Sequence, residues 1–101
     1  MPTRDAAEER RLVDQLRVYQ LEKLEARRAH GHWGGDDVGS LFAKLRKELE
    51  ELHFELFYRP GTPEQIAREC ADVANYAAMI ADVVKARCTP PATAEPGEGK
   101  A

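Results

Sequence analysis

Apolar residues recur with helical spacing along most of the chain, and three such segments predict three helices. The first runs from about residue 5 to residue 29, with acidic residues early and Thr3 as the N-cap candidate. A segment with three glycines, residues 30–37, then interrupts the pattern and predicts a loop. This loop carries the chain's only tryptophan, Trp33.

A second helix is expected to begin between Asp37 and Ser40 and to continue to about Tyr58. Aspartate and serine favour the N-cap position, and one apolar stripe then follows the helix. The stripe comprises Val38, Phe42, Leu45, Leu49, Leu52 and Leu56. Pro60 and Gly61 predict the turn after this helix.

The third helix has a clear start signal. Thr62 is a favourable N-cap, Pro63 suits the first helical position, and Gln65 completes a capping box. We expect the helix to extend to about Cys88 with two neighbouring stripes along it. One stripe is made of Ile66, Cys70, Val73, Ala77, Ile80 and Val84, and the other of Ala67, Ala71, Ala74, Ala78 and Ala81. A helix that is apolar over so much of its circumference is typical of a central helix with neighbours on several sides.

Composition indicates a thin core. The chain has 101 residues, and 15 of its hydrophobic residues are alanines, so few large side chains remain to close the fold. We predict one all-α domain, residues 1–88, in which an antiparallel helical hairpin and the N-terminal helix form a four-helix-bundle-like oligomer. Residues 89–101 are rich in proline and glycine and are expected to be a disordered tail.

Charge and cysteine content exclude several classes. A net charge of −3 argues against binding to a nucleic acid polymer, because such proteins usually present a basic face. No run approaches the ~18 apolar residues of a membrane span, and charged residues begin at once, so a cytoplasmic location without membrane contact is predicted. Cys70 and Cys88 lie roughly 27 Å apart along one helix and are expected to be reduced thiols.

Four acidic side chains are spaced for a common site. Glu48 and Glu51 lie three residues apart on the second predicted helix, and Glu69 and Asp72 lie three apart on the third. In an antiparallel hairpin, residues at the same height are equally distant from the turn. Both cross-helix pairs, 48 with 72 and 51 with 69, centre on Pro60. The sequence therefore predicts that all four carboxylates meet at one level.

The setting of these acids points to a metal. Glu69 lies in an apolar sector of its helix, and converging carboxylates repel one another and lose hydration unless cations compensate them. All-oxygen ligation favours Mg²⁺, Mn²⁺ or Ca²⁺ over zinc, and we predict Mg²⁺ with Mn²⁺ as a substitute. We therefore predict Glu48, Glu51, Glu69 and Asp72 as the metal ligands. The alternative is that they lie on solvated faces, as most helix glutamates do.

The spacing of these acids resembles the signature of the MazG-like all-α nucleoside triphosphate pyrophosphohydrolases, which is E-x-x-E followed by E-x-x-D. Here it is Glu48-Leu-Glu-Glu51, then 17 residues, then Glu69-Cys-Ala-Asp72. The resemblance covers about residues 30–84 and is strongest to the small phage and bacterial members.

The resemblance implies an enzyme that cleaves a nucleoside triphosphate to a monophosphate and pyrophosphate. The four carboxylates would be the catalytic residues and would hold Mg²⁺ on the phosphates. Many members carry a glutamate immediately before the first motif glutamate, where this chain has Lys47. The general base is therefore unassigned. The resemblance also implies a homodimer or a homotetramer.

Four further residues are candidates for substrate binding. Asn75 and Tyr76 follow the second acidic motif, and in the enzymes that this chain resembles such positions contact the nucleotide. Lys44 lies one turn before the first motif and is placed to reach a phosphate, while Trp33 is suited to stack on a base. The alternatives are a solvated face for Asn75, core packing for Tyr76, a surface position for Lys44 and a corner plug for Trp33.

Other interpretations remain beside the enzyme. Phe54 and Phe57 lie across the second helix from its leucine stripe, which indicates an interface. A non-catalytic helical oligomerisation or interaction module, with acids that are only surface charge, is the alternative function. Glu50 and His53 form half of a di-iron motif, but the third helix supplies Asp72 in place of a second histidine.

Overall fold

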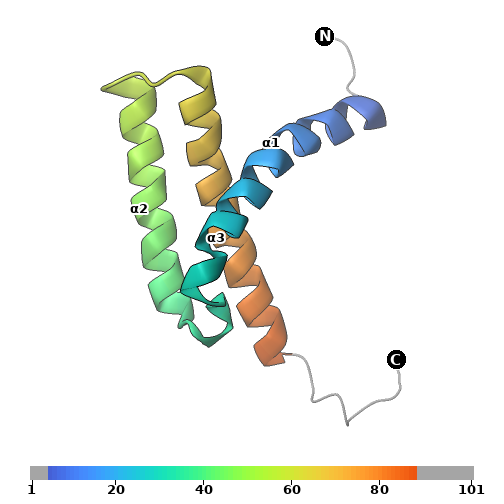
Figure 1. Ribbon diagram of the computed structural model, residues 1–101, viewed down its shortest axis with the longest axis vertical. Coiled ribbons are helices and arrows are strands. Elements are labelled where there is room, and N and C mark those ends of the chain that lie inside the picture. The colour runs from blue at the N-terminus through green and yellow to red at the C-terminus, as the bar shows by residue number, and fades with distance from the viewer. Residues whose placement is uncertain (1–4, 89–101) are drawn as a thin grey trace.

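The computed structural model describes residues 5–88, which form three α-helices (Figure 1). They are α1 (Ala6–Arg27), α2 (Val38–Phe57) and α3 (Pro63–Cys88), with short 3₁₀ helices at Arg28–His30 and Trp33–Gly35. No strand occurs within residues 5–88, so the predicted all-α fold is confirmed. The predicted tail, residues 89–101, and the Cys88 thiol lie outside the described part, whereas Cys70 is a free cysteine as expected.

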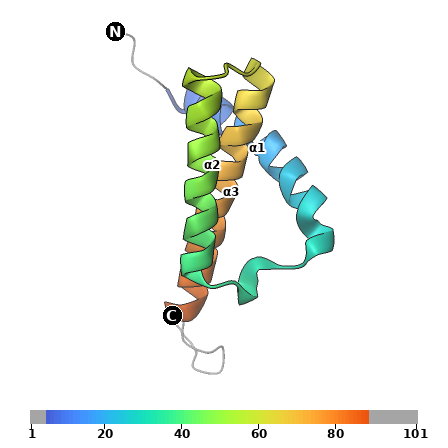
Figure 2. The same cartoon turned by 90° about the vertical axis from the view of Figure 1, so that its left-hand side faces the viewer.

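Helices α2 and α3 form the predicted antiparallel hairpin (Figure 2). The amides of Tyr58 and Arg59 both donate to the carbonyl of Phe54, which ends α2. At the start of α3, the Gln65 amide donates to Thr62 Oγ1 over 3.1 Å, and the Thr62 amide donates to Gln65 Oε1 over 2.8 Å. This reciprocal pair is a capping box, so the predicted start of the third helix is confirmed.

The caps of the other two helices differ in how well they were predicted. Asp37 accepts a hydrogen bond from the Ser40 amide over 3.3 Å and caps α2 as expected. On α1 the cap is Asp5, which accepts from the Glu8 amide over 2.8 Å. The assignment of the cap to Thr3 was wrong, because the helix begins one residue after Asp5 and a carboxylate suits the positive end of a helix.

The core is small and lies on one side of α3. Its buried apolar side chains are Leu41 from α2 and Ala71, Met79 and Val83 from α3. Together with buried Asn75, the α3 members recur every four residues, on the side of the helix that α1 and α2 cover. In the C-terminal half of α3, the two predicted stripes are largely uncovered in the single chain. The exposed members are Ala77, Ala78, Ala81 and Val84.

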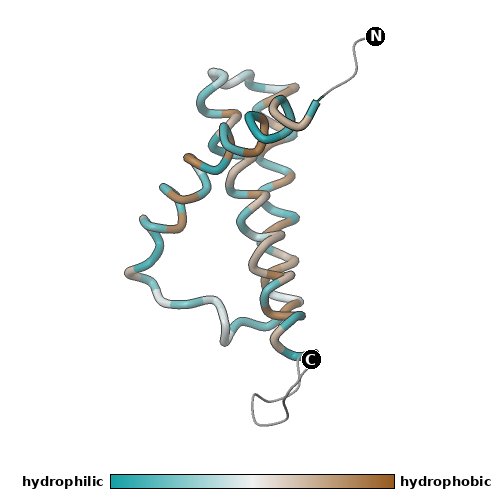
Figure 3. Tube along the Cα trace, turned by 90° about the vertical axis from the view of Figure 1, so that its right-hand side faces the viewer, coloured by the Kyte–Doolittle hydropathy of each residue, from teal (hydrophilic) through white to brown (hydrophobic). Residues whose placement is uncertain are grey.

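Helix α1 packs against α3 rather than α2, and its N-terminal half projects away from the hairpin (Figure 1). None of its residues is buried. Apolar and polar positions follow one another along it (Figure 3). Its exposed large apolar side chains are Leu12, Val13, Val18 and Leu21. None of the helices within the described range is long and apolar enough to cross a membrane.

Candidate metal centre

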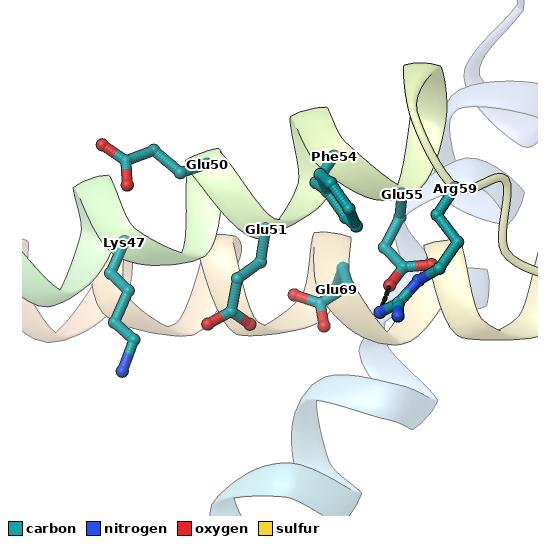
Figure 4. Close-up of a pocket in the computed structure, with 7 residues that line it drawn as sticks. All are labelled: Lys47, Glu50, Glu51, Phe54, Glu55, Arg59 and Glu69. Atoms are coloured by element: carbon teal, nitrogen blue, oxygen red, sulfur yellow. Dashed lines mark hydrogen bonds and ion pairs between the residues drawn. The ribbon is translucent and has the colours of Figure 1, made fainter.

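Three of the four predicted carboxylates come together between α2 and α3. Glu48 and Glu51 extend from α2 and Glu69 from α3, and one carboxylate oxygen of each lies within 4.8 Å of the other two. Figure 4 shows Glu51 and Glu69 side by side, whereas Glu50 points away from them. The height predicted from the turn at Pro60 is therefore confirmed for this group.

The three acids differ in exposure, and their mutual repulsion changes their pKa values. Burial raises the pKa of Glu48 to about 7, and the charges of Glu51, Asp72 and Glu69 add to this shift in that order. Burial also raises the pKa of Glu69, with further contributions from Glu51 and Asp72, while nearby Lys23 lowers it. The expectation that converging carboxylates resist ionisation is confirmed for these two residues.

One carboxylate oxygen of Glu69 is left without a hydrogen-bond partner in the described chain. Glu69 Oε1 is buried and has no hydrogen-bond partner among the residues that the structure describes. A buried carboxylate oxygen without a partner carries a desolvation cost that a cation would remove. Because every potential ligand atom in the group is a carboxylate oxygen, the residues fit a hard divalent cation such as Mg²⁺ or Mn²⁺.

The fourth predicted ligand, Asp72, lies beside the group and forms an ion pair with Lys23 of α1. Its Oδ2 is 3.1 Å from Nζ of Lys23 on α1, and both side chains are only partly exposed. Lys23 is a functional candidate that the sequence analysis missed. The signal was weak, because nothing in the sequence indicates which residues of α1 face α3.

A cavity of about 280 Å³ lies between α1 and the carboxylates of Glu48 and Asp72. Two predicted substrate contacts, Asn75 and Tyr76, also line it. Asn75 is buried, so the solvated alternative for it is wrong. Its Oδ1 accepts from Gln20 Nε2 over 3.2 Å, and its Nδ2 donates to the Gln20 carbonyl over 3.1 Å. Its polar atoms therefore attach α3 to α1.

The other two predicted substrate contacts lie away from the carboxylates. Trp33 Nε1 donates to Asp82 over 2.9 Å, the ring stacks on His32 at 4.3 Å, and the side chain packs against the core. This arrangement matches the alternative in which Trp33 fills the corner between the first two helices. Lys44 is exposed and lines neither cavity beside the cluster.

A second cavity, of about 360 Å³, lies on the other side of the cluster (Figure 4). Glu51, Glu69 and Phe54 line it together with Lys47, and an ion pair of Arg59 with Glu55 closes one end over 3.5 Å. The carboxylates are therefore accessible from two sides. The di-iron alternative receives no support, since Glu50 points away and His53 instead contacts the rings of Phe57 and Tyr58.

Comparison with protein-family models, with curated proteins and with solved structures finds no match to this chain. The geometry described above is consequently the basis for any functional assignment.

Proposed function

We propose that this protein is a Mg²⁺-dependent nucleotide pyrophosphohydrolase that cleaves nucleoside or deoxynucleoside triphosphates to monophosphates and pyrophosphate. The observation that carries the proposal is the convergence of Glu48, Glu51 and Glu69 around a buried, unpartnered carboxylate oxygen. The resemblance of their spacing, with Asp72, to the signature of the MazG-like enzymes supplies the substrate class and the bond that is cleaved.

In this proposal the chain's own residues position the reactants. Glu48, Glu51 and Glu69 would hold the metal, and Asp72 would complete the ligand set from the next turn of α3. When bound, Mg²⁺ would supply charge neutralisation on the phosphates and would lower the pKa of an attacking water molecule.

The test is pyrophosphate release from each common nucleoside and deoxynucleoside triphosphate in the presence of Mg²⁺. We expect Glu69→Gln to lower the rate about 100-fold or more, because a metal ligand is lost. Glu50→Gln is the matched control, since it removes the same charge from a side chain that points away from the cluster. Absence of release with every nucleotide, or full activity of Glu69→Gln, would contradict the proposal.

We further infer that the chain works as a homodimer or a homotetramer. The single chain buries few large apolar side chains and exposes many, which favours an interface between chains. The aromatic residues at the end of α2 belong to this uncovered surface, namely Phe54, Phe57 and Tyr58, which are 46%, 70% and 71% exposed.

The same exposed residues favour a second candidate, a non-catalytic helical interaction module. In such a protein the acids would only keep the surface hydrated, and replacing Glu69 would leave the protein's assembly and its other properties unchanged. The two functions are separated by metal binding: the enzyme requires a saturable Mg²⁺ or Mn²⁺ site that Glu69→Gln weakens, and the module does not.

A further inference from the structure

The cavity between α1 and the carboxylates has walls of opposite charge. One wall consists of Glu48 and Asp72, which extend from α2 and α3. The facing wall comes from the end of α1 and the turn after it, and it carries Lys23, Arg27 and His30. A cavity that places cations opposite a candidate metal group suits a ligand that is itself an anion bound to a metal.

Arg27 is held in place but is incompletely paired. Its Nη1 donates to the hydroxyl of Tyr76 over 3.0 Å, and its guanidinium lies 5.5 Å from the centre of the Tyr76 ring. Its Nε is buried and has no acceptor among the residues of the described chain. An arginine side chain offers five donors in a planar fork. Because only one hydrogen bond, to Tyr76, engages its Nη groups within the described chain, Arg27 has further donors that suit an oxyanion.

Lys23 reaches from its own wall of the cavity to an acid of the facing wall. It pairs with Asp72 over 3.1 Å. A divalent cation on the carboxylates would repel the Lys23 ammonium and compete with it for Asp72. Lys23 would then face the cavity with its donors available to a second anion.

We propose that Lys23 and Arg27 form the binding site for the phosphate chain of a metal-bound polyphosphate, and that Lys23 exchanges Asp72 for phosphate when the metal arrives. This inference rests on the proposed function, because the glutamate cluster must first hold the metal. It implies that the metal binds before or together with the phosphates. Without the metal, the phosphates would meet uncompensated carboxylates and a lysine already engaged.

The size of the cavity limits what it recognises. A volume of about 280 Å³ lies just below the range of about 300–1,000 Å³ that is usual for drug-sized ligands. The cavity has room for the phosphate chain, which is the part of the ligand that Lys23 and Arg27 face. Inorganic tripolyphosphate, which has neither sugar nor base, is accordingly a sufficient probe.

The test measures two affinities in the full chain, that of Mn²⁺ alone and that of tripolyphosphate in the presence of Mg²⁺. We expect Lys23→Gln to bind Mn²⁺ more tightly, because a competing cation is gone, and to bind tripolyphosphate about tenfold more weakly. Opposite changes of this kind would not arise from general damage to the fold, which would weaken both. Arg27→Gln should weaken tripolyphosphate binding by a similar factor and change Mn²⁺ binding little.

Arg17→Gln is the matched control, since it removes a positive charge from an exposed part of α1 that pairs only with Asp14, at 3.8 Å. It should change neither affinity by more than about twofold. Lys23 is partly exposed, so its variant remains informative if the Arg27 variant fails to fold.

The outcomes separate this inference from the proposed function. The phosphate site alone is overturned if Mn²⁺ binds normally but Lys23→Gln and Arg27→Gln leave the affinity for tripolyphosphate unchanged. It is also overturned if Mn²⁺ binds normally and the wild-type protein does not bind tripolyphosphate. Tripolyphosphate binding that depends on both residues, without hydrolysis of any nucleotide, overturns the proposed function alone. Absence of a saturable Mn²⁺ site overturns both.

Discussion

The N-terminal half of α1, which we define as residues 6–18, and its C-terminal half, residues 19–27, use different interactions. In the C-terminal half, Gln20, Lys23 and Arg27 each contact a side chain of α3 through a hydrogen bond or an ion pair. Glu22 adds a further ion pair with Arg68 of α3 over 2.7 Å. These contacts fix which residues of α1 face the carboxylate cluster.

In the N-terminal half, the polar side chains pair within the helix itself. Arg11 lies 4.0 Å from Glu8, and Arg17 lies 3.8 Å from Asp14. Apolar side chains of this half line a groove of about 1140 Å³ that is open to solvent, and the groove continues along the start of α3 and along Tyr19, Gln20 and Glu22 of the other half. The comparison indicates that specific polar bonds build the wall of the site, whereas the other half of the helix presents apolar surface.

The largest effect should come from breaking the bonds that attach the C-terminal half. Asn75→Ala removes both hydrogen bonds to Gln20 and leaves a partly buried amide without its partner. We expect a loss of about 2–3 kcal/mol in the free energy of unfolding, measured by urea denaturation. Asp14→Ala in the N-terminal half is the control, with less than about 0.5 kcal/mol. Equal losses in the two variants would contradict the difference between the halves.

The next effect concerns association through the N-terminal half. Leu12 and Val18 are 58% and 66% exposed, so their replacement by serine should barely change the stability of a single chain. If this half is covered by a second copy, each replacement should weaken self-association about tenfold or more, since burial of such a side chain contributes roughly 1.5–3 kcal/mol.

Sedimentation over a concentration series measures this association. Phe57→Ser serves as the comparison, because it changes an equally exposed side chain at the end of α2. Loss of association in that variant alone would move the interface to the aromatic end of α2. A wild-type protein that stays monomeric at all concentrations would contradict the predicted oligomer.

Local signals in the sequence predicted the hairpin and the level of the carboxylates. Thr62 and Gln65 define where α3 begins, and the turn then fixes the heights of Glu48, Glu51 and Glu69. Each of these features depends on residues close in the sequence or on simple helix geometry.

The placement of α1 could not be predicted in the same way. Besides its helically spaced apolar residues, α1 carries others on different sides, such as Val13, Val18 and Leu21, so no single stripe marks the side that packs on α3. The contacts that choose this side, such as those of Asn75 with Gln20 and of Lys23 with Asp72, join residues far apart in the sequence. For the same reason, a solvated face stood as the alternative for Asn75, and Lys23 and Arg27 were not recognised as part of the site.

A smaller effect is the change in the stability of the fold with pH, which depends on the carboxylate cluster beside the C-terminal half of α1. The pKa of Glu48 is about 7 in the folded chain against 4.5 for an ordinary glutamate, so the folded state holds this proton more tightly than the unfolded state. The stability that protonation provides is therefore complete below pH 4.5 and is lost as the pH rises through 7. Because Glu48 is partly exposed, we expect the loss to be about 1 kcal/mol.

Thermal denaturation with and without Mg²⁺ measures this dependence. Mg²⁺ binds the ionised cluster, so it should raise the melting temperature more at pH 8 than at pH 5.5. In Glu48→Gln the decline of stability with pH should flatten in the metal-free protein. A metal-free stability that instead rises steadily between these two pH values would contradict the raised pKa.

The smallest effect is expected where the N-terminal half relies only on its own ion pairs. Arg17→Ala breaks a pair in which both side chains are more than half exposed, at 68% and 56%. Because such pairs gain little in water and are screened by salt, the free energy of unfolding should change by less than about 0.5 kcal/mol.

The variant to compare it with is Arg68→Ala in α3, which affects the C-terminal half of α1. It removes a cation that bonds Glu22 over 2.7 Å and lies over the ring of Tyr19 at 5.1 Å. It should be the more destabilising of the two in the same denaturation experiment, because it removes contacts that join α1 to α3. Equal, small changes in both would mean that α1 is held on α3 by the bonds of Asn75, Lys23 and Arg27 alone.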